Sequence, residues 1–117
     1  MIYYKEGCKE LASAGAAILL LDGHMENGTP IFVTRKVVGT HGVKFGRDSK
    51  WVVKLDSPLS DDATGLYPAF ILGINMGDGM DITPLVDLVH KKYSFLSIQE
   101  RMMLISDARV RLKEAKS

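Results

Sequence analysis

Residues 34–54, TRKVVGTHGVKFGRDSKWVVK, contain two apolar, β-branched runs separated by a segment with three glycines. β-Branched residues are enriched in strands, whereas glycines often mark turns and loops. The stretch therefore predicts two strands joined by a glycine-rich loop. Residues 31–54 hold six cations and one acid, so the predicted hairpin is also strongly basic.

The second strand of this hairpin shows the alternation of a half-buried strand. Trp51, Val53 and Leu55 fall on one face, and Val52 and Lys54 fall on the other. A tryptophan buries a large apolar area when it packs inside a protein. We therefore expect Trp51 to anchor the core unless it lines a binding site.

The segment before the hairpin predicts a further strand pairing. An aliphatic run at 16–21 is followed by Asn27-Gly28, the residue pair that a two-residue type I′ turn selects, and then by the apolar run 31–38. Such a turn places Leu20 opposite Arg35. The aliphatic strand and the basic strand are therefore expected to be neighbours.

Helices are predicted near both ends of the chain. Residues 5–13 have helical spacing, with Gly15 as a left-handed C-terminal cap. Asp81 is expected to cap a helix that ends near Tyr93. Ser97 and Glu100 have the spacing of a capping box, which opens a last helix that continues to the end of the chain.

The middle of the chain predicts one more strand. The segment 57–65 is rich in Pro, Ser, Asp and Gly and predicts an acidic surface loop. The apolar run 67–74 then resembles a buried strand with a proline at its start. Together the segments predict an α+β fold in a single domain over 1–117: a small, mostly antiparallel sheet of about four strands, a short N-terminal helix and two C-terminal helices.

Composition restricts the class of protein. The chain has 117 residues, 46% hydrophobic and 25% charged, which is typical of a globular domain. The single cysteine, Cys8, favours a reducing compartment, and we expect a cytoplasmic protein. The run 16–21 is too short for a membrane span, and no signal peptide or membrane anchor is expected.

Charge is segregated along the chain, although the formal net charge is only +1. The basic segment 31–54 is followed by 55–90, which holds six aspartates and no lysine or arginine, and then by a basic C-terminal segment. Such blocks can neutralise one another inside the molecule, pair between subunits, or orient a charged partner.

The glycine-rich loop is the candidate ligand site, because orientable N–H groups beside cations can bind an anion. Its spacing matches neither the P-loop nor the dinucleotide-binding fingerprint. Aromatic residues among the cations also suit nucleic acid. The candidate ligand-binding residues are Arg35, Lys36, Thr40, His41, Lys44, Arg47 and Lys50.

The first functional interpretation is a small, non-enzymatic protein that binds nucleic acid or a phosphate-bearing small molecule through this hairpin. A second is a protein–protein interaction module or homo-oligomer, such as a small phage or bacterial inhibitor or adaptor, acting through its segregated charged surfaces. A third is a metal-assisted enzyme with its site at the 75–81 loop, where Asp78 and Asp81 supply oxygen ligands. The residues form no complete catalytic or metal motif, so we expect no catalytic residue, metal or cofactor.

Overall fold

The computed structural model describes residues 8–57, 59–60 and 71–116. One antiparallel sheet has the strand order β3-β2-β1-β4-β5. Its elements in chain order are α1 (Cys8–Ala14), β1 (Ala17–His24), β2 (Pro30–Phe45), β3 (Asp48–Leu55), β4 (Gly73–Asn75), β5 (Met80–Asp81), α2 (Thr83–Lys92) and α3 (Ile98–Lys116). The predicted α+β class, the antiparallel sheet and the placement of the helices are confirmed.

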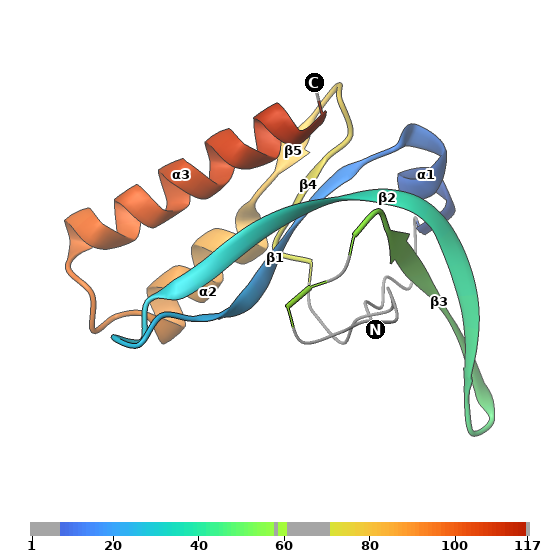
Figure 1. Cartoon of the computed structure of the whole chain (residues 1–117), viewed down its shortest axis with the longest axis horizontal. Coiled ribbons are helices and arrows are strands. Elements are labelled where there is room, and N and C mark those ends of the chain that lie inside the picture. Colours follow the sequence, from blue (N-terminus) through green and yellow to red (C-terminus); the bar gives the residue numbers. More distant parts are fainter. Residues whose placement is uncertain (1–7, 58, 61–70, 117) are drawn as a thin grey trace.

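Strand β1 is central, and its first four residues, 17–20, are buried on both faces. Ile18 and Leu20 pack with Leu11 of α1 on one face, whereas Leu19 packs with α2 and α3 on the other. Figure 1 shows α3 running along the sheet, with α2 below it. Burial on both faces explains why β1 is a continuous apolar run rather than an alternating one.

Helix α1 ends as the sequence predicts. Gly15 has a φ of +61°, which is the left-handed conformation that glycine adopts without strain. Its N–H donates to the carbonyl of Ala12, and the N–H of Ala16 donates to that of Leu11. These two bonds form a Schellman motif that turns the chain directly into β1.

The turn between β1 and β2 differs from the predicted one. Met25 and Thr29 close a three-residue loop, through an N–H to C=O bond of 2.8 Å, and Gly28 has a φ of +88°. A type I turn followed by a left-handed glycine gives this loop. The loop moves the pairing by one residue, and an irregularity between Leu21 and His24 moves it by one more, so Leu20 pairs with Val33 rather than with Arg35. The register moves by two residues, an even number, so each side chain keeps its predicted face.

The largest correction concerns the glycine-rich segment. Residues 39–45 are not a loop, because they continue β2 and pair with β3 as far as Phe45 and Asp48. The turn itself is only Gly46-Arg47, where Gly46 has a φ of +60°. A positive φ at the first central residue alone is the pattern of a type II′ turn.

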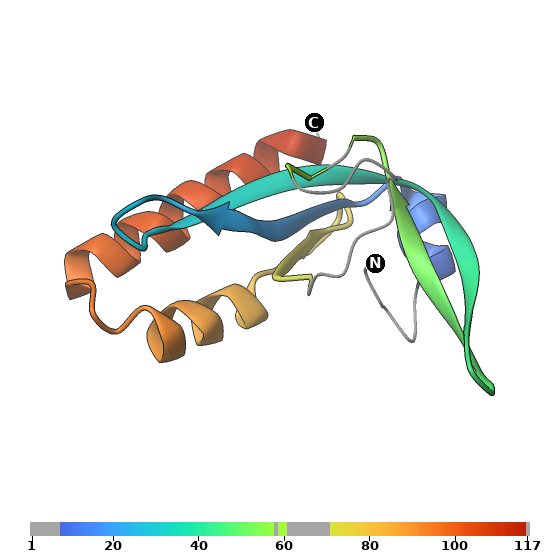
Figure 2. The same cartoon turned by 60° about the horizontal axis from the view of Figure 1, so that its bottom comes forward.

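Strand β2 is therefore 16 residues long, and its two halves have different partners. Its first half pairs with β1, and after an irregularity between Val37 and Gly39 its second half pairs with β3. Figures 1 and 2 show that β2 arches strongly and carries the β2–β3 hairpin away from α2 and α3.

The remaining predictions are met in part. Ser97 and Glu100 form the predicted capping box at the start of α3, with reciprocal bonds of 3.1 and 3.3 Å. Helix α2 has Ile82 rather than Asp81 at the N-cap position. Of the predicted strand 67–74, residues 67–70 lie outside the described part of the chain, and β4 starts at Gly73.

Candidate functional site

The β2–β3 hairpin places the predicted ligand residues on two faces. Residues that pair directly across an antiparallel ladder project to the same face. Gly42 pairs with Trp51, so Thr40 and Lys44, two residues to either side of Gly42, share the face of Trp51. His41 projects from the opposite face, and both His41 and Lys44 are exposed. We refer to Thr40, Gly42, Lys44 and Trp51 as the Trp51 face.

Trp51 is 47% exposed, so the prediction that it anchors the core is wrong. Val53 and Leu55, on the same face, are buried with Leu11 and Val37. The strand therefore has the predicted alternation, but this cluster of buried residues ends at Val53 and the hairpin continues beyond it. The indole lies over Gly42, where a Cβ atom would stand 3.9 Å from the ring carbons Cζ3 and Cη2.

The backbone of the hairpin does not have the predicted form of an anion-binding loop. Residues 39–45 are extended and paired with β3, so their N–H groups alternate in direction along the strand. They cannot converge on one point as the N–H groups of a phosphate-binding loop do. An anion at this hairpin would therefore be bound by side chains.

Arg35 and Lys36 lie on the first half of β2, away from the tip. Arg35 is half-buried, and its Nη1 donates to the carbonyl of Thr34 at 2.7 Å. The backbone of Lys36 is held by Asp56: its N–H donates to Oδ1 at 3.0 Å, and its carbonyl accepts from the N–H of Asp56 at 3.0 Å. The structure therefore separates this pair from Lys44 and Arg47.

Arg47 is an exposed residue of the turn at the tip of the hairpin. Lys50 pairs with Val43 through the backbone ladder, but its side chain lies outside the described part of the structure. Of the seven predicted residues, Thr40 and Lys44 thus meet on the Trp51 face, with Arg47 at the tip beyond them.

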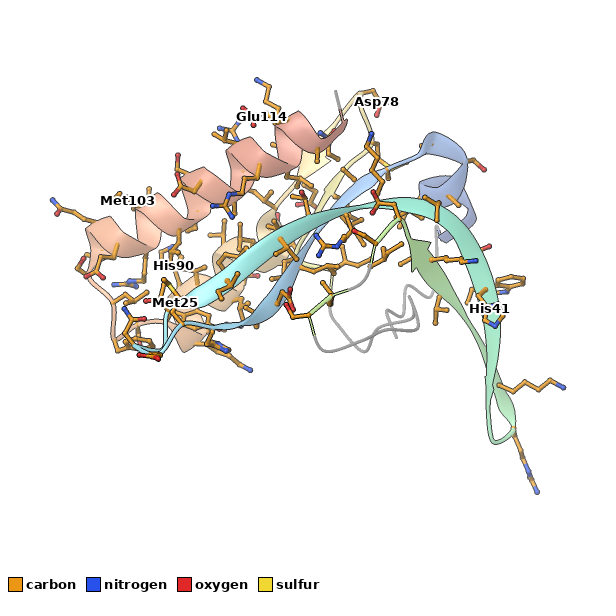
Figure 3. All side chains as sticks on the ribbon, in the orientation of Figure 1. Met25, His41, Asp78, His90, Met103 and Glu114 are labelled. Carbon is orange, nitrogen blue, oxygen red and sulfur yellow. The ribbon has the colours of Figure 1, made fainter. Side chains whose placement is uncertain are left out.

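The described aspartates of the acidic segment 55–90 lie in separate parts of the fold. Asp56 lies at the base of the hairpin, whereas Asp78 lies in the turn between β4 and β5, far from His41 in Figure 3. Asp81 and Asp87 belong to β5 and α2. Asp61 and Asp62 lie outside the described residues. None of the acids from 78 to 87 is therefore on the hairpin.

The 75–81 loop has a mixed electrostatic environment. A pocket beside it is lined by Asp78 together with Arg109 and Lys113 of α3, and two cations oppose the binding of a metal ion. Asp81 is engaged with α2, because its Oδ1 accepts the N–H of Thr83 at 2.9 Å. This bond lowers the pKa of Asp81. Within the described ranges, no group of three or more His, Cys, Asp or Glu side chains is arranged to hold a metal.

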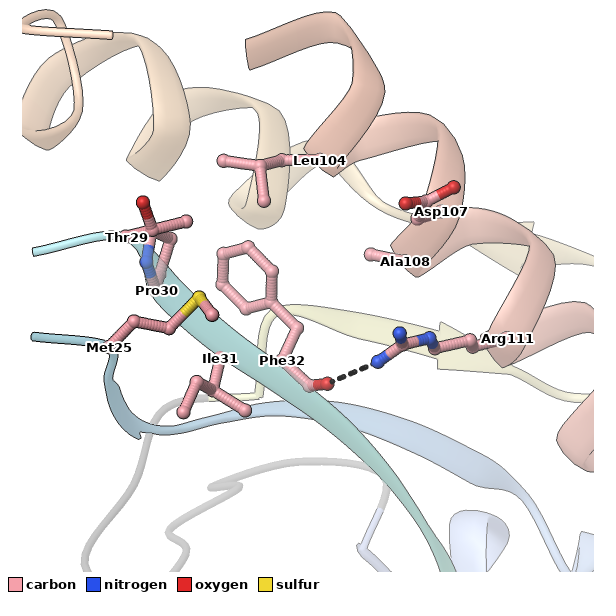
Figure 4. Close-up of a pocket in the computed structure, with 9 residues that line it drawn as sticks. All are labelled: Met25, Thr29, Pro30, Ile31, Phe32, Leu104, Asp107, Ala108 and Arg111. Atoms are coloured by element: carbon pink, nitrogen blue, oxygen red, sulfur yellow. Dashed lines mark hydrogen bonds between the residues drawn. The ribbon is translucent and has the colours of Figure 1, made fainter. Parts of the chain in front are cut away.

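A second pocket, which the sequence did not indicate, lies between α3 and the start of β2 (Figure 4). It has a volume of about 380 Å³. The side chain of Arg111 reaches from α3 to β2, where its Nη1 donates to the carbonyl of Phe32 at 3.2 Å. The lining residues are Met25, Thr29, Pro30, Ile31, Phe32, Leu104, Asp107, Ala108 and Arg111. The pocket forms where α3 packs beside the start of β2, about 75 residues away in the sequence. Local sequence patterns do not predict such packing.

Comparison of the chain with protein-family models, with curated proteins and with solved structures finds no match. Among the helices of the described chain, none has both the length and the apolar character that a membrane crossing requires.

Proposed function

We propose that the chain is a non-enzymatic protein that binds single-stranded nucleic acid through the Trp51 face of the β2–β3 hairpin. The observation that carries this proposal is the position of the half-exposed indole on a projecting ribbon, on the same face as Lys44 and with Arg47 at the tip beyond them. The lone cysteine supports a cytoplasmic location.

The chemistry of the face favours a polymer over a small phosphate ligand. A small anion needs donors that surround it, whereas the hairpin presents a row of exposed side chains on an extended ladder. Nucleic-acid strands suit such a row, because cations attract successive phosphates and an aromatic ring stacks on a base. A single strand offers unpaired bases for stacking, while a duplex keeps its bases enclosed.

The single tryptophan of the chain makes the proposal directly testable. Titration with a single-stranded oligonucleotide is expected to change the fluorescence of Trp51, and the affinity is expected to fall as the salt concentration rises. A duplex of equal length and a mononucleotide are expected to bind more weakly. Absence of binding by every oligonucleotide at low salt would refute the proposed function.

Variants locate the binding surface. With a labelled oligonucleotide, Lys44→Ala with Arg47→Ala should weaken binding and reduce the slope of log K against log salt by roughly 0.7 per lost contact. Trp51→Ala should cost about 1–3 kcal/mol. Lys91→Ala with Lys92→Ala is the matched control, because it removes two exposed cations from α2. Equal losses in the two charge variants would show that binding is not at the hairpin.

A further inference from the structure

The first half of β2 has an open edge. On the side away from β1, no described strand pairs with β2 between Ile31 and Arg35, because β3 pairs only from Val37 onward. An open edge presents unpaired N–H and C=O groups, and these can pair with another extended chain.

The direction of each backbone group on this edge follows from the hydrogen bonds. Val37 donates from its N–H to Ala16, next to β1, so the odd-numbered residues in the first half of β2 direct their backbone N–H and C=O groups towards β1. Lys36 instead bonds to Asp56 on the outer side. The even-numbered residues Phe32 and Thr34 therefore direct both their N–H and C=O groups outward.

Two arginines bond to two of the carbonyl acceptors of this edge, and its N–H donors stay open. The carbonyl of Phe32 accepts from Arg111, and the carbonyl of Thr34 accepts from Arg35. No residue of the described chain accepts a hydrogen bond from the N–H of Phe32 or of Thr34. Pro30 also lies on this edge, and it has a carbonyl to offer but no N–H.

We infer that this edge pairs with the same edge of a second copy of the chain, about a two-fold axis beside Phe32. In that antiparallel register each Phe32 exchanges both N–H to C=O bonds with its copy. Each Thr34 N–H meets the carbonyl of the Pro30 in the other chain. Four hydrogen bonds form, and they use both open donors of each chain.

The missing donor of Pro30 fits this register. In the antiparallel pair, the carbonyl of Thr34 lies opposite Pro30, which cannot donate to it. That carbonyl already accepts from Arg35 at 2.7 Å. The carbonyl of Phe32 has two lone pairs, so it can accept from Arg111 and from a second chain together.

Side chains beside the edge are also self-complementary. Ile31, which is 39% exposed, would pair across the two-fold axis with Val33 of the other chain. Helix α3 and β2 run in the same general direction (Figure 1), so the axis makes the two α3 helices antiparallel. Asp107 and Arg111 are exposed on the edge side of α3, and this arrangement brings the Arg111 of each chain towards the Asp107 of the other.

The first test is sedimentation of the whole chain over a wide range of concentration. A reversible dimer is expected, because a two-fold interface uses the same surface of both chains. Amide hydrogen exchange at Phe32 and Thr34 should slow as the dimer forms, whereas Ile31 and Val33, which face β1, should change little. A monomer at every concentration would overturn the inference. The open edge would then be available only to an extended segment of a different protein.

Two variants test the register. Thr34→Pro removes the outward N–H without breaking a bond to β1, and it should weaken dimerisation about tenfold or more. Thr34→Val keeps the donor and is the control. Asp107→Arg, which leaves the β2 backbone unchanged, should also weaken the dimer, and adding Arg111→Asp should restore part of the loss. A dimer that tolerates both Thr34→Pro and Asp107→Arg would not use this edge.

Discussion

Gly73 of β4 lies directly beneath Leu112 of α3, and a Cβ atom added to Gly73 would stand 2.9 Å from Cδ2 of Leu112. The added Cβ atom would also lie 3.3 Å from Cγ2 of Ile82 and 3.3 Å from Cβ of Leu19. Leu112 is fully buried, so neighbouring side chains leave it little space in which to move. The absence of a side chain at Gly73 therefore sets how closely α3 approaches the sheet.

Gly73→Ala should destabilise the fold by about 1–3 kcal/mol, because the added methyl group must displace packed side chains. Urea denaturation measures the loss. Gly79→Ala is the matched control, since an added Cβ there has no neighbour within 4 Å. Similar losses at the two positions would contradict the close packing of α3 on β4.

The capping box of α3 yields a second stability prediction. Ser97→Ala removes the oxygen that accepts the N–H of Glu100, and it should cost about 1 kcal/mol. Ser106→Ala, in the middle of α3 and exposed, should have little effect in the same denaturation experiment. Alanine favours a helix interior more than serine does, so a loss at Ser106 as large as that at Ser97 would contradict the capping bond as the cause.

Asp81 gives a prediction about pH. The hydrogen bond from the backbone N–H of Thr83, followed by that from its side chain, lowers the pKa of Asp81 below the ordinary 3.8. Its stabilising contribution is therefore present above the unfolded-state pKa and is lost as the pH falls through the folded-state pKa. The effect on overall stability should be small, because this carboxylate is exposed.

An NMR titration of the Asp81 carboxyl carbon measures the shift directly. Thr83→Val removes the side-chain donor but keeps the backbone N–H, so it should raise the pKa of Asp81 only part of the way. An unchanged pKa would remove the Thr83 side chain as a cause, while a complete return to 3.8 would contradict the leading role of the backbone bond.

The elements that the sequence predicts well are those with local causes. The C-terminal cap at Gly15 and the capping box at Ser97 are each formed within about five residues. The alternation of residues 50–55 is likewise local, and Val53 and Leu55 do face the core. Each of these features depends only on neighbours that the sequence places together.

The predictions that are wrong concern residues whose conformation or burial depends on contacts with distant parts of the chain. Gly39 and Gly42 favour a loop by local preference, but pairing with β3 holds them in an extended strand. The alternation of a strand also does not show where the core ends, and Trp51 lies on the predicted face but is exposed. The pocket at Arg111 and the open edge of β2 exist because the first half of β2 pairs with β1 and only the second half pairs with β3. The pattern of residues along the sequence does not show which strands will pair.

Because β2 is continuous from Pro30 to Phe45, the proposed edge pairing and the proposed nucleic-acid surface belong to one strand. A dimer formed at the edge would present two hairpins on a single body. Occupation of the first hairpin would then raise the local concentration of ligand at the second when one nucleic-acid strand can reach both. The apparent affinity for long strands should consequently exceed that for short ones by avidity, and the excess should disappear when the chain is diluted below its dimerisation constant.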